Sequence, residues 1–312
     1  VSPEHIIEYL KENTAITLKN VEEEADITIG LLGRVLRGER VLKDIHIEKL
    51  VPILMKYGFK EHQIKKKTRI ISLVNHKGGV GKTTSTLNLG KGLSNEGKKV
   101  LIVDMDAQAN LSQSLNVEQP EESVYSVFCN KAKLPIIEIS ENFHLVPSDI
   151  DLGKAELELQ SAVNGYFRLK KALKEVESNY DYILIDCPPS LGILTINSLM
   201  ASTDVIVCVQ SEFLALKGLN TVLEMIDDMQ EDLHPDLNLL GMLLTMTNRT
   251  IIKQNIIESI KKAHLKKVFE TTIRQNIAVV EASSLGMDIF SYNESCAAAQ
   301  DYKEMVQEIL KR

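Results

Sequence analysis

Apolar residues recur at three- and four-residue steps throughout the first 64 residues, which is the spacing of one face of an α-helix. Four segments carry this pattern: PEHIIEYLKEN, TLKNVEEEA, TIGLLGRVLRG and IHIEKLVPILMKYG. The later segments are separated by short breaks at 26–28 and 38–42. The stretch 65–68, Lys-Lys-Lys-Thr, is basic and has no apolar period. The pattern therefore predicts a small all-α domain over residues 1–64 and a basic linker at 65–68.

The pattern changes at Arg69, after which short β-branched runs alternate with helical periods. The strand-length runs are RIISLVN, KKVLIVD, FHLVPS, YDYILID, DVIVCVQ and LNLLGMLLTM. Runs that are apolar at nearly every position are typical of strands buried on both faces of a parallel sheet. Because helical segments lie between most of these runs, the pattern predicts an α/β fold with a doubly wound, mostly parallel sheet over residues 69–312.

The last segment, SCAAAQDYKEMVQEILKR, is predicted to form an amphipathic helix. Its apolar side consists of Tyr302, Met305, Val306, Ile309 and Leu310. We expect this helix to pack on the sheet rather than on a membrane surface. No apolar run approaches the roughly 18 residues that span a bilayer, and the N-terminus lacks the pattern of a signal peptide. No membrane association is therefore expected.

Composition and charge leave this picture largely unchanged. Hydrophobic residues make up 44% and charged residues 25%, which is ordinary for a globular protein. The net charge of −7 is uneven, since residues 1–68 hold 12 Lys+Arg and 11 Asp+Glu and the remainder holds 24 and 32. Because basic clusters survive locally, the net charge does not exclude nucleic acid. Four separated cysteines without a C-x-x-C pair argue against a zinc site and suit a reducing cytoplasm.

The segment HKGGVGKT at 76–83 lies between the predicted strand RIISLVN and the helical segment TTSTLNLGKGL. Strand, glycine-rich loop and helix in this order are the context of a phosphate-binding P-loop. The glycines let successive backbone N–H groups point at phosphate oxygens, and the helix start adds partial positive charge. Lys82 would reach the β- and γ-phosphates of ATP, and the Thr83 hydroxyl would ligate Mg²⁺. The predicted nucleotide-binding residues are Lys77, Gly78, Gly79, Val80, Gly81, Lys82, Thr83 and Thr84.

His76 and Lys77 depart from the general P-loop pattern. The residues KGGVGKTT match every position of the deviant Walker A loop K-G-G-x-G-K-[ST]. On these residues the chain resembles the ParA/MinD superfamily of P-loop NTPases, and later motifs resemble its ParA (Soj-like) branch. In that family the first lysine reaches across a dimer interface to ATP held by the other subunit, so the resemblance implies that Lys77 acts in trans, as an arginine finger does. The alternative is a solvated loop lysine.

Two acidic segments follow predicted strands at the edge where doubly wound sheets bind ligands. KKVLIVDMDAQANLS is similar to the family segment V-D-x-D-P-Q-x-N, with Ala107 in place of proline. The resemblance assigns Asp106 to hydrolysis, whereas Asp104 is left as a neighbour of the metal or a structural residue. YDYILIDCPPSLGILTINSL is close to a ParA signature, in which Asp186 would hold Mg²⁺ through water; a turn carboxylate capping a helix is the alternative. The predicted catalytic residues are Lys77, Lys82 and Asp106, and the predicted metal ligands are Thr83, Asp106 and Asp186.

A further segment, VCVQSEFLALKGL, resembles the family pattern P-x-Q-x-E-x-x-[AS]-L-x-G-L. Val209 stands where the family often has proline. Because of this departure, no residue of the segment is assigned to the adenine base.

Residues 18–40, LKNVEEEADITIGLLGRVLRGER, resemble a helix-turn-helix of the lambda-repressor-like kind. Thr28 is expected to cap the second helix. Core spacing is met by Val21, Ala25, Ile27 and Leu32. The second helix would present Gly30, Leu31, Gly33, Arg34 and Arg37, with Arg40 just beyond it. Arginines at such positions can meet phosphates or guanine edges, so Arg34 and Arg37 are the candidate DNA contacts.

Three features weigh against DNA binding by this segment. The sequence EEEAD makes the first helix acidic, Glu22 stands where the motif commonly has alanine, and Asp26 stands where it has glycine. Two alternatives therefore remain open for residues 1–64. One is a DNA-binding domain, and the other is a helical regulatory or dimerisation domain.

Residues 247–276, TNRTIIKQNIIESIKKAHLKKVFETTIRQN, form the one basic stretch of the second part. The resemblance implies non-specific DNA binding there, through phosphate contacts that make binding steeply salt-dependent. The family segment I-P-R-N-V-R is similar to IRQNIA, in which Ala278 lacks a basic contact that Arg274 is expected to supply. The predicted DNA-binding residues are Arg249, Lys253, Lys261, Lys262 and Arg274. A solvated helix face is the alternative.

The resemblance covers residues 69–311. It implies a cytoplasmic, nucleoid-associated ATPase of the ParA type that forms a homodimer around two ATP·Mg²⁺ and binds DNA in that state. Hydrolysis would be slow until a ParB-like or other centromere-binding protein stimulates it, in plasmid or chromosome segregation. The nitrogenase iron protein shares the loop, but Cys129 and Cys187 are not in its cluster-binding motifs, and no MinD-like membrane helix is evident after the fold.

Two other functions remain open. One is an ATPase that positions a non-DNA or membrane-associated cargo, in the manner of MinD. The other is a transcriptional regulator that binds DNA through residues 1–64 and uses ATP as an effector.

Overall fold

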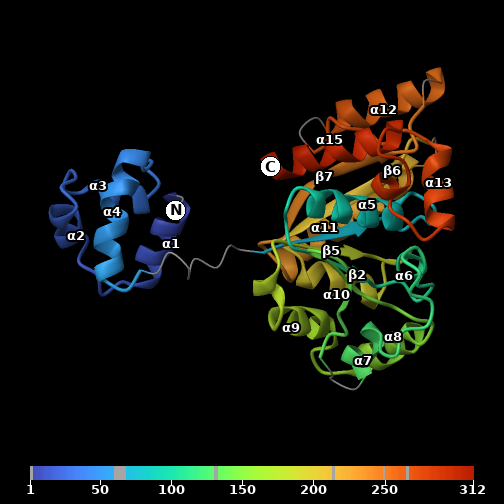
Figure 1. The fold of residues 1–312 in the computed structure, drawn as a ribbon, viewed down its shortest axis with the longest axis horizontal. Helices are drawn as coiled ribbons and strands as arrows, with labels where there is room; N and C mark the ends of the chain where they lie inside the picture. Colours follow the sequence, from blue (N-terminus) through green and yellow to red (C-terminus); the bar gives the residue numbers. More distant parts are fainter. Residues whose placement is uncertain (1–2, 60–67, 130–132, 213–214, 249, 265–266) are drawn as a thin grey trace. The chain divides into compact units, whose positions relative to one another are not determined.

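The computed structural model describes residues 3–59, 68–129, 133–212, 215–248, 250–264 and 267–312. The chain divides into two compact units, Val1–Lys66 and Lys67–Arg312 (Figure 1). Each unit has its own hydrophobic core. Of the expected linker at 65–68, the first three residues lie outside the described part of the chain. The Thr68 hydroxyl lies 2.6 Å from the carbonyl oxygen of Glu177 and 2.9 Å from that of Tyr180, so Thr68 belongs to the second unit.

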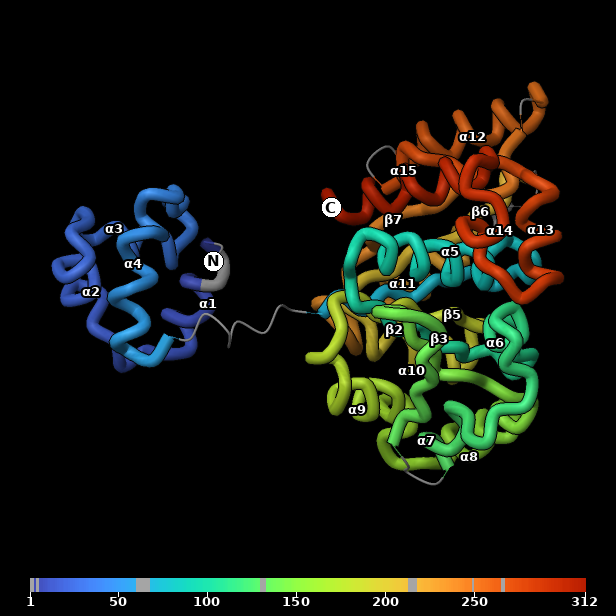
Figure 2. Tube along the Cα trace, viewed as in Figure 1, coloured from blue at the N-terminus to red at the C-terminus, as the bar shows by residue number. Residues whose placement is uncertain are grey.

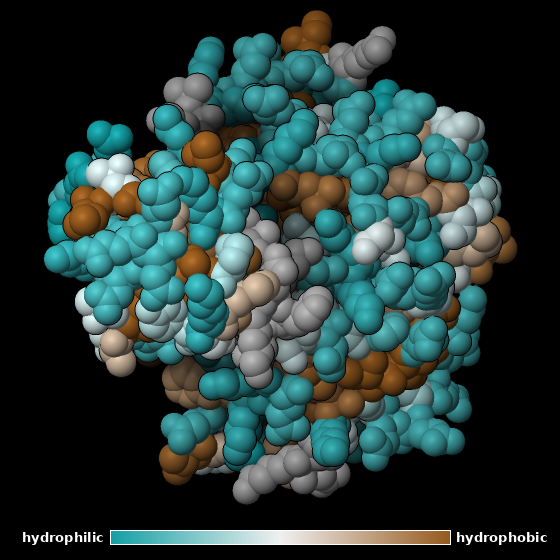
Figure 3. All heavy atoms as spheres, turned by 60° about the vertical axis from the view of Figure 1, so that its left-hand side comes forward, coloured by the Kyte–Doolittle hydropathy of each residue, from teal (hydrophilic) through white to brown (hydrophobic). Residues whose placement is uncertain are grey.

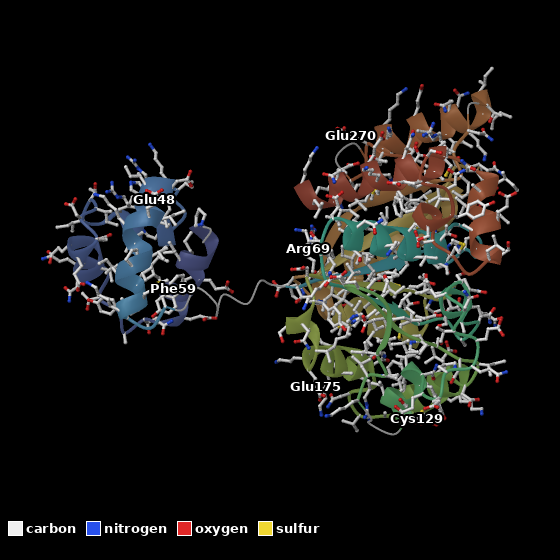
Figure 4. The ribbon with its side chains drawn as sticks, in the orientation of Figure 1. Glu48, Phe59, Arg69, Cys129, Glu175 and Glu270 are labelled. Atoms are coloured by element: carbon white, nitrogen blue, oxygen red, sulfur yellow. The ribbon has the colours of Figure 1, made fainter. Side chains whose placement is uncertain are left out.

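The first unit is helical, as its apolar spacing predicts. Its helices are α1 (Pro3–Glu12), α2 (Leu18–Glu24), α3 (Leu31–Leu36) and α4 (Asp44–Lys56). The predicted core residues Val21, Ala25 and Leu32 are buried, and Ile27 packs against them half-buried. Phe59, labelled in Figure 4, makes an edge-to-face contact with Tyr9, with ring centroids 5.0 Å apart.

The turn between α2 and α3 corrects two expectations. Thr28 does not cap α3, because the N-cap position is taken by Gly30 at a φ of 82°. The cap comes instead from Glu22, which is 2% exposed and accepts hydrogen bonds from the backbone N–H groups of Gly30 (2.7 Å) and Leu32 (2.6 Å). Leu31, expected on the presented face, is buried in the core. The acidic residue that departs from the helix-turn-helix pattern therefore satisfies free N–H groups at a helix start.

The second unit is built on one sheet, whose order is β3-β4-β2-β5-β1-β6-β7. The strands are β1 (Arg69–Val74), β2 (Val100–Asp104), β3 (Ile137–Ser140), β4 (Phe143–Val146), β5 (Tyr182–Asp186), β6 (Asp204–Gln210) and β7 (Asn238–Thr245). All strands but β3 are the predicted runs and pair in parallel, which confirms the doubly wound, mostly parallel sheet. The sequence pattern misses β3, a short and partly exposed edge strand that pairs antiparallel with β4.

Helices cover both faces of this sheet. They are α5 (Lys82–Asn95), α6 (Asn110–Gln113), α7 (Val124–Cys129), α8 (Leu152–Ser161), α9 (Arg168–Lys174), α10 (Ile193–Ala201), α11 (Ala215–Asp232), α12 (Ile251–Ala263), α13 (Ile277–Ser284), α14 (Ile289–Asn293) and α15 (Ala297–Lys311), with short 3₁₀ turns at Gly165–Phe167 and Glu177–Asn179. Helices α5 and α13 to α15 pack on one face and α7 to α12 on the other. Figures 1 and 2 show α5 and α15 on one side of the sheet and α9 and α10 on the other.

The final helix, α15, packs on the sheet as predicted. Its buried residues include Tyr302, Met305, Val306 and Ile309, whereas Leu310 is half-buried. Hydrophilic side chains cover most of the molecular face shown in Figure 3. Among the described residues, no helix is both long and apolar enough to cross a membrane.

The two edges of the sheet differ in their charges. At the carboxyl edge, the parallel register places Asp104 of β2 beside Asp186 of β5, next to the end of β1. At the amino edge, Arg69, labelled in Figure 4, forms an ion pair with Asp204 at 3.0 Å. The amino edge is therefore neutralised within the chain, and the carboxyl edge gathers acidic residues beside the glycine-rich loop.

Candidate functional site

The loop between β1 and α5 has the backbone that a phosphate cradle requires. Gly79 and Gly81 have φ values of 73° and 86°, a left-handed conformation that glycine adopts without strain. A Cβ added to Gly78 would lie 3.9 Å from the Cβ of Pro189, so the loop runs close to the segment that follows β5. The loop and the carboxyl end of β5 therefore form one site.

Hydrogen bonds hold the loop to the sheet and also join residues within the loop. Lys82 is 6% exposed, and its Nζ donates a hydrogen bond to the carbonyl oxygen of Lys77 at 3.2 Å. The carbonyl oxygen of Val80 accepts from the Thr245 hydroxyl at the end of β7 (2.7 Å). Thr83 lies in the first turn of α5. The predicted nucleotide-binding residues 77–84 thus lie together in one loop and one helical turn.

Asp186 is the most unusual carboxylate of the site. It is fully buried, and neither of its oxygens has a hydrogen-bond partner within the described chain. Burial raises the pKa of Asp186 well above its usual range, the charge of Asp104 adds to the rise, and Thr83 and Lys82 act in the opposite direction. A buried carboxylate without a partner is costly unless a cation compensates it.

This surrounding fits Mg²⁺. Magnesium takes oxygen ligands and is usually bound by one or two carboxylates, water and substrate phosphates. Asp186 and the neighbouring Thr83 hydroxyl are the oxygen groups that would hold it. Asp106, the third predicted ligand, also acts on Asp186, and its part in metal binding remains a prediction. Among the described residues no three His, Cys, Asp or Glu side chains gather as metal ligands. Water and phosphate oxygens would complete the coordination, as is usual for Mg²⁺.

Asp104 holds the loop that carries Asp106. One Asp104 oxygen accepts from the backbone N–H of Asp106 (3.1 Å), and the other accepts from the N–H and hydroxyl of Ser112 (2.9 and 2.7 Å). Burial raises the pKa of Asp104 to about 6, although the Ser112 hydrogen bonds oppose this. Asp106 is half-buried, and its charge contributes to the raised pKa of Asp186. The structure thus gives Asp104 a structural role and brings Asp106 near Asp186.

Lys77 makes contacts that the sequence did not assign. Its Nζ lies 2.7 Å from Oε2 of Glu212 and 3.2 Å from Oε1 of Gln210. Gln210 is the last residue of β6 and Glu212 follows it, and together they form the pattern Q-x-E in VCVQSEFLALKGL. Glu212 in this pattern is the sequence signal by which a partner of Lys77 could have been found. The action of Lys77 in trans remains a prediction.

The candidate DNA contacts of the first unit are engaged within it. The Nε of Arg34 donates to the carbonyl oxygen of Gly30 at 3.1 Å. Arg37 forms an ion pair with Glu39 at 2.7 Å. Glu39 therefore compensates the charge of Arg37, the C-cap residue of α3, whereas Arg34 keeps its full charge because a carbonyl oxygen is neutral. Both side chains retain exposed surface.

The basic stretch of the second unit contains both residues that are engaged within the chain and residues that are exposed. Arg249 lies outside the described residues. Lys253 donates to the carbonyl oxygen of Met246 (2.8 Å), whereas Lys261 is half-buried and Lys262 is exposed at the end of α12. Arg274 forms an ion pair with the buried Asp301 at 2.6 Å and is bound by both of its oxygens. Arg274 is therefore ion-paired within the chain, and its expected contact with DNA remains a prediction.

The second unit is similar to known proteins. Residues 68–239 match the family described as AAA domain. The chain is 42% identical over 247 residues to the sporulation initiation inhibitor protein Soj of Bacillus subtilis, covering 77% of this chain and 98% of that protein. It is 40% identical over 248 residues to the chromosome-partitioning ATPase Soj of Treponema pallidum, covering 78% and 98%. A similar solved structure is cobyrinic acid a,c-diamide synthase from Mycobacterium smegmatis with bound ATP analog and magnesium, with a TM-score of 0.69, 32% identity and coverage of 78% and 95%.

Proposed function

The chain belongs to the ParA/Soj family of partitioning ATPases, and on this basis we propose that it is an ATP-driven DNA-partitioning switch. It binds ATP with Mg²⁺, forms a homodimer in that state and holds DNA without sequence preference. It hydrolyses ATP slowly until a ParB-like or other centromere-binding protein stimulates it. This activity would move plasmid or chromosome DNA over the nucleoid.

The observation that carries the proposal is the buried Asp186, which has no hydrogen-bond partner among the described residues and lies beside the buried Lys82 of the phosphate loop. Lys82 would neutralise the β- and γ-phosphates through charge-assisted hydrogen bonds. Thr83 and Asp186 would hold Mg²⁺, which stabilises the charge that develops on the phosphate oxygens. Asp106, held by Asp104, would orient the attacking water. The proposed reaction requires no cofactor other than ATP and Mg²⁺.

The second lysine makes the active unit a pair of chains. Lys77 is 42% exposed, whereas Lys82 of the same loop is buried. An exposed lysine beside a phosphate site can deliver its charge to a nucleotide bound by another chain, as an arginine finger does. Lys77 would in this way couple dimerisation to the presence of the γ-phosphate.

DNA would bind through α12 and its neighbourhood. Lys253, Lys261 and Lys262 lie on this helix, and Arg249 precedes it. Contacts from such side chains neutralise phosphates and carry no base specificity. Arg274 is not included, because Asp301 already neutralises it.

A second role is favoured by the first unit. Its α2–α3 segment keeps the predicted helix-turn-helix core, and Arg34, Arg37 and Arg40 follow one another along α3 and its exit. This arrangement supports sequence-specific regulation of transcription through residues 1–64, with ATP as effector. A footprint on a specific operator that survives Lys82→Ala would separate this role from partitioning.

Retention on random-sequence DNA tests the main proposal. We expect the wild type to retain DNA with ATP and to release it with ADP, over a salt series from about 50 to 200 mM. Lys261→Glu with Lys262→Glu should weaken retention and lower the salt slope by about 2, because two phosphate contacts are lost. Glu231→Gln on the exposed side of α11 is the control. Equal retention with ATP and ADP would contradict the proposal.

A further inference from the structure

Three consecutive residues, 75–77, tie the phosphate loop to β6 and to the chain that follows it as far as α11. The side-chain N–H of Asn75 donates to the carbonyl oxygen of Cys208 (2.6 Å), and its amide oxygen accepts from the backbone N–H of Lys77 (3.0 Å). The ring of His76 packs so closely on Gly218 in α11 that a Cβ there would collide with it. His76 and Lys77, the two residues that depart from an ordinary P-loop, therefore both contact β6 or the chain that follows it.

Lys77 completes this connection with its charge. Its ammonium group lies 2.7 Å from Glu212 and 3.2 Å from Gln210, and both acceptors belong to the same chain as the lysine. The hydrogen bond from Lys77 lowers the pKa of Glu212 below its usual value, which favours the charged carboxylate further. A nucleotide held by another chain would compete with Glu212 for this ammonium group.

We propose that Glu212, assisted by Gln210, is the resting acceptor of Lys77 and competes for it with the phosphates of ATP bound by a second copy of the chain. This inference rests on the proposed function, because it requires Lys77 to act between chains. Glu212 is a positioning residue: it holds the lysine near the loop before dimerisation and does not contact the reacting phosphate. Dimerisation must exchange the Lys77–Glu212 pair for a Lys77–phosphate pair.

The exposure of the pair indicates how strong the competition is. The side chains of Lys77 and Glu212 are 42% and 44% exposed. Exposed ion pairs are weak, and the loss of one changes an equilibrium by about 1.4- to 5-fold. A triphosphate carries more charge than one carboxylate, so it displaces Glu212. Because each dimer releases two lysines, the pair sets a threshold for dimerisation without preventing it.

The resting contact is measurable in the chain bound to ADP. We expect acylation of Lys77 by an amine-reactive ester, followed by mass spectrometry, to be about 2- to 5-fold faster in Glu212→Gln than in the wild type. The amine must leave its acceptor to react, and a neutral amide holds it less well. Lys99, an exposed lysine outside the loop, is the internal reference. Equal Lys77 rates in the two proteins overturn the inference.

The competition is measured by sedimentation with a non-hydrolysable ATP analogue and Mg²⁺. We expect the association constant of the dimer to rise about 3- to 10-fold in Glu212→Gln, with unchanged affinity for ADP. Glu212→Ala removes the acceptor altogether and should show at least the same rise. Glu231→Gln, which removes an equal charge from the exposed side of α11, should match the wild type.

The possible failures are distinct. If the wild type forms dimers and both Glu212 variants dimerise no more tightly than it does, the inference is wrong and the proposed function stands. If the wild type remains monomeric at saturating analogue, the proposed function is wrong, and the competition is wrong with it.

Discussion

Two helices of this chain begin in the same way but differ in the anion at their start. Gly30 precedes α3 with a φ of 82°, and Gly81 precedes α5 with a φ of 86°. At α3 the free N–H groups are occupied by the buried carboxylate of Glu22. At α5 no carboxylate of the described residues accepts a hydrogen bond from the backbone N–H groups of residues 78–84.

The difference shows what separates a structural turn from a binding site. The start of a helix attracts negative charge wherever it occurs. Where the chain supplies the anion itself, as Glu22 does, the turn stabilises its unit. Where it supplies none and adds a buried lysine, as at Lys82, the same geometry is available to a phosphate. The substitutions below test this distinction, from the largest expected effect to the smallest.

Removing the lysine should affect binding most. We expect Lys82→Ala to lower ATP affinity at least about 30-fold, since truncating one partner of a buried charge pair costs about 2–5 kcal/mol. Titration with a fluorescent ATP analogue measures this. Lys99→Ala, outside the loop, should bind as the wild type does. An unchanged ATP affinity in Lys82→Ala would show that the phosphates do not bind at this loop, and the comparison between the two helix starts would be wrong.

Removing the internal anion should affect stability and leave binding unchanged. We expect Glu22→Ala to destabilise the first unit by about 1–3 kcal/mol, because two N–H groups lose a buried acceptor. Hydrogen exchange at the amides of Gly30 and Leu32 measures this in the full chain. Glu23→Ala on the exposed side of the same helix is the control. If these amides exchange at the same rate in Glu22→Ala and Glu23→Ala, Glu22 is not the cap.

The neutralised amino edge of the sheet gives a smaller, pH-dependent effect. Burial acts to raise the pKa of Asp204, but hydrogen bonds from Arg69, Asn238 and Thr203 outweigh it and leave that pKa below its usual value. A lowered carboxyl pKa stabilises the fold above the unfolded-state pKa of about 3.9, and this stabilisation is lost as pH falls through the folded-state pKa. We expect Asp204→Asn to cost about 1 kcal/mol at neutral pH.

Urea unfolding over a pH series checks this. The difference in the free energy of unfolding between wild type and Asp204→Asn should narrow as pH falls below about 4. Asp228→Asn, on the exposed side of α11, should show no such trend. A difference that stays constant down to acid pH would show that Asp204 does not act through its charge.

The same contrast explains how far the sequence could predict this molecule. Apolar runs and a glycine-rich pattern between a strand and a helix reflect local backbone requirements, so the sheet and the phosphate loop were predictable. The Arg274–Asp301 ion pair and the Lys77–Glu212 contact join residues far apart in sequence, and no local pattern encodes them. Glu22 was misleading for a similar reason: it looked like a departure from a motif, because its partners come from the following turn.

Sedimentation of wild type and Lys77→Ala, each with an ATP analogue and with ADP, tests the central claim most directly. The wild type should be a dimer with the analogue and a monomer with ADP. Lys77→Ala should bind the analogue with wild-type affinity, because its own loop still contains Lys82. It should nevertheless remain a monomer. The account would be contradicted if Lys77→Ala dimerised as the wild type does, or if it lost its affinity for the analogue as a monomer.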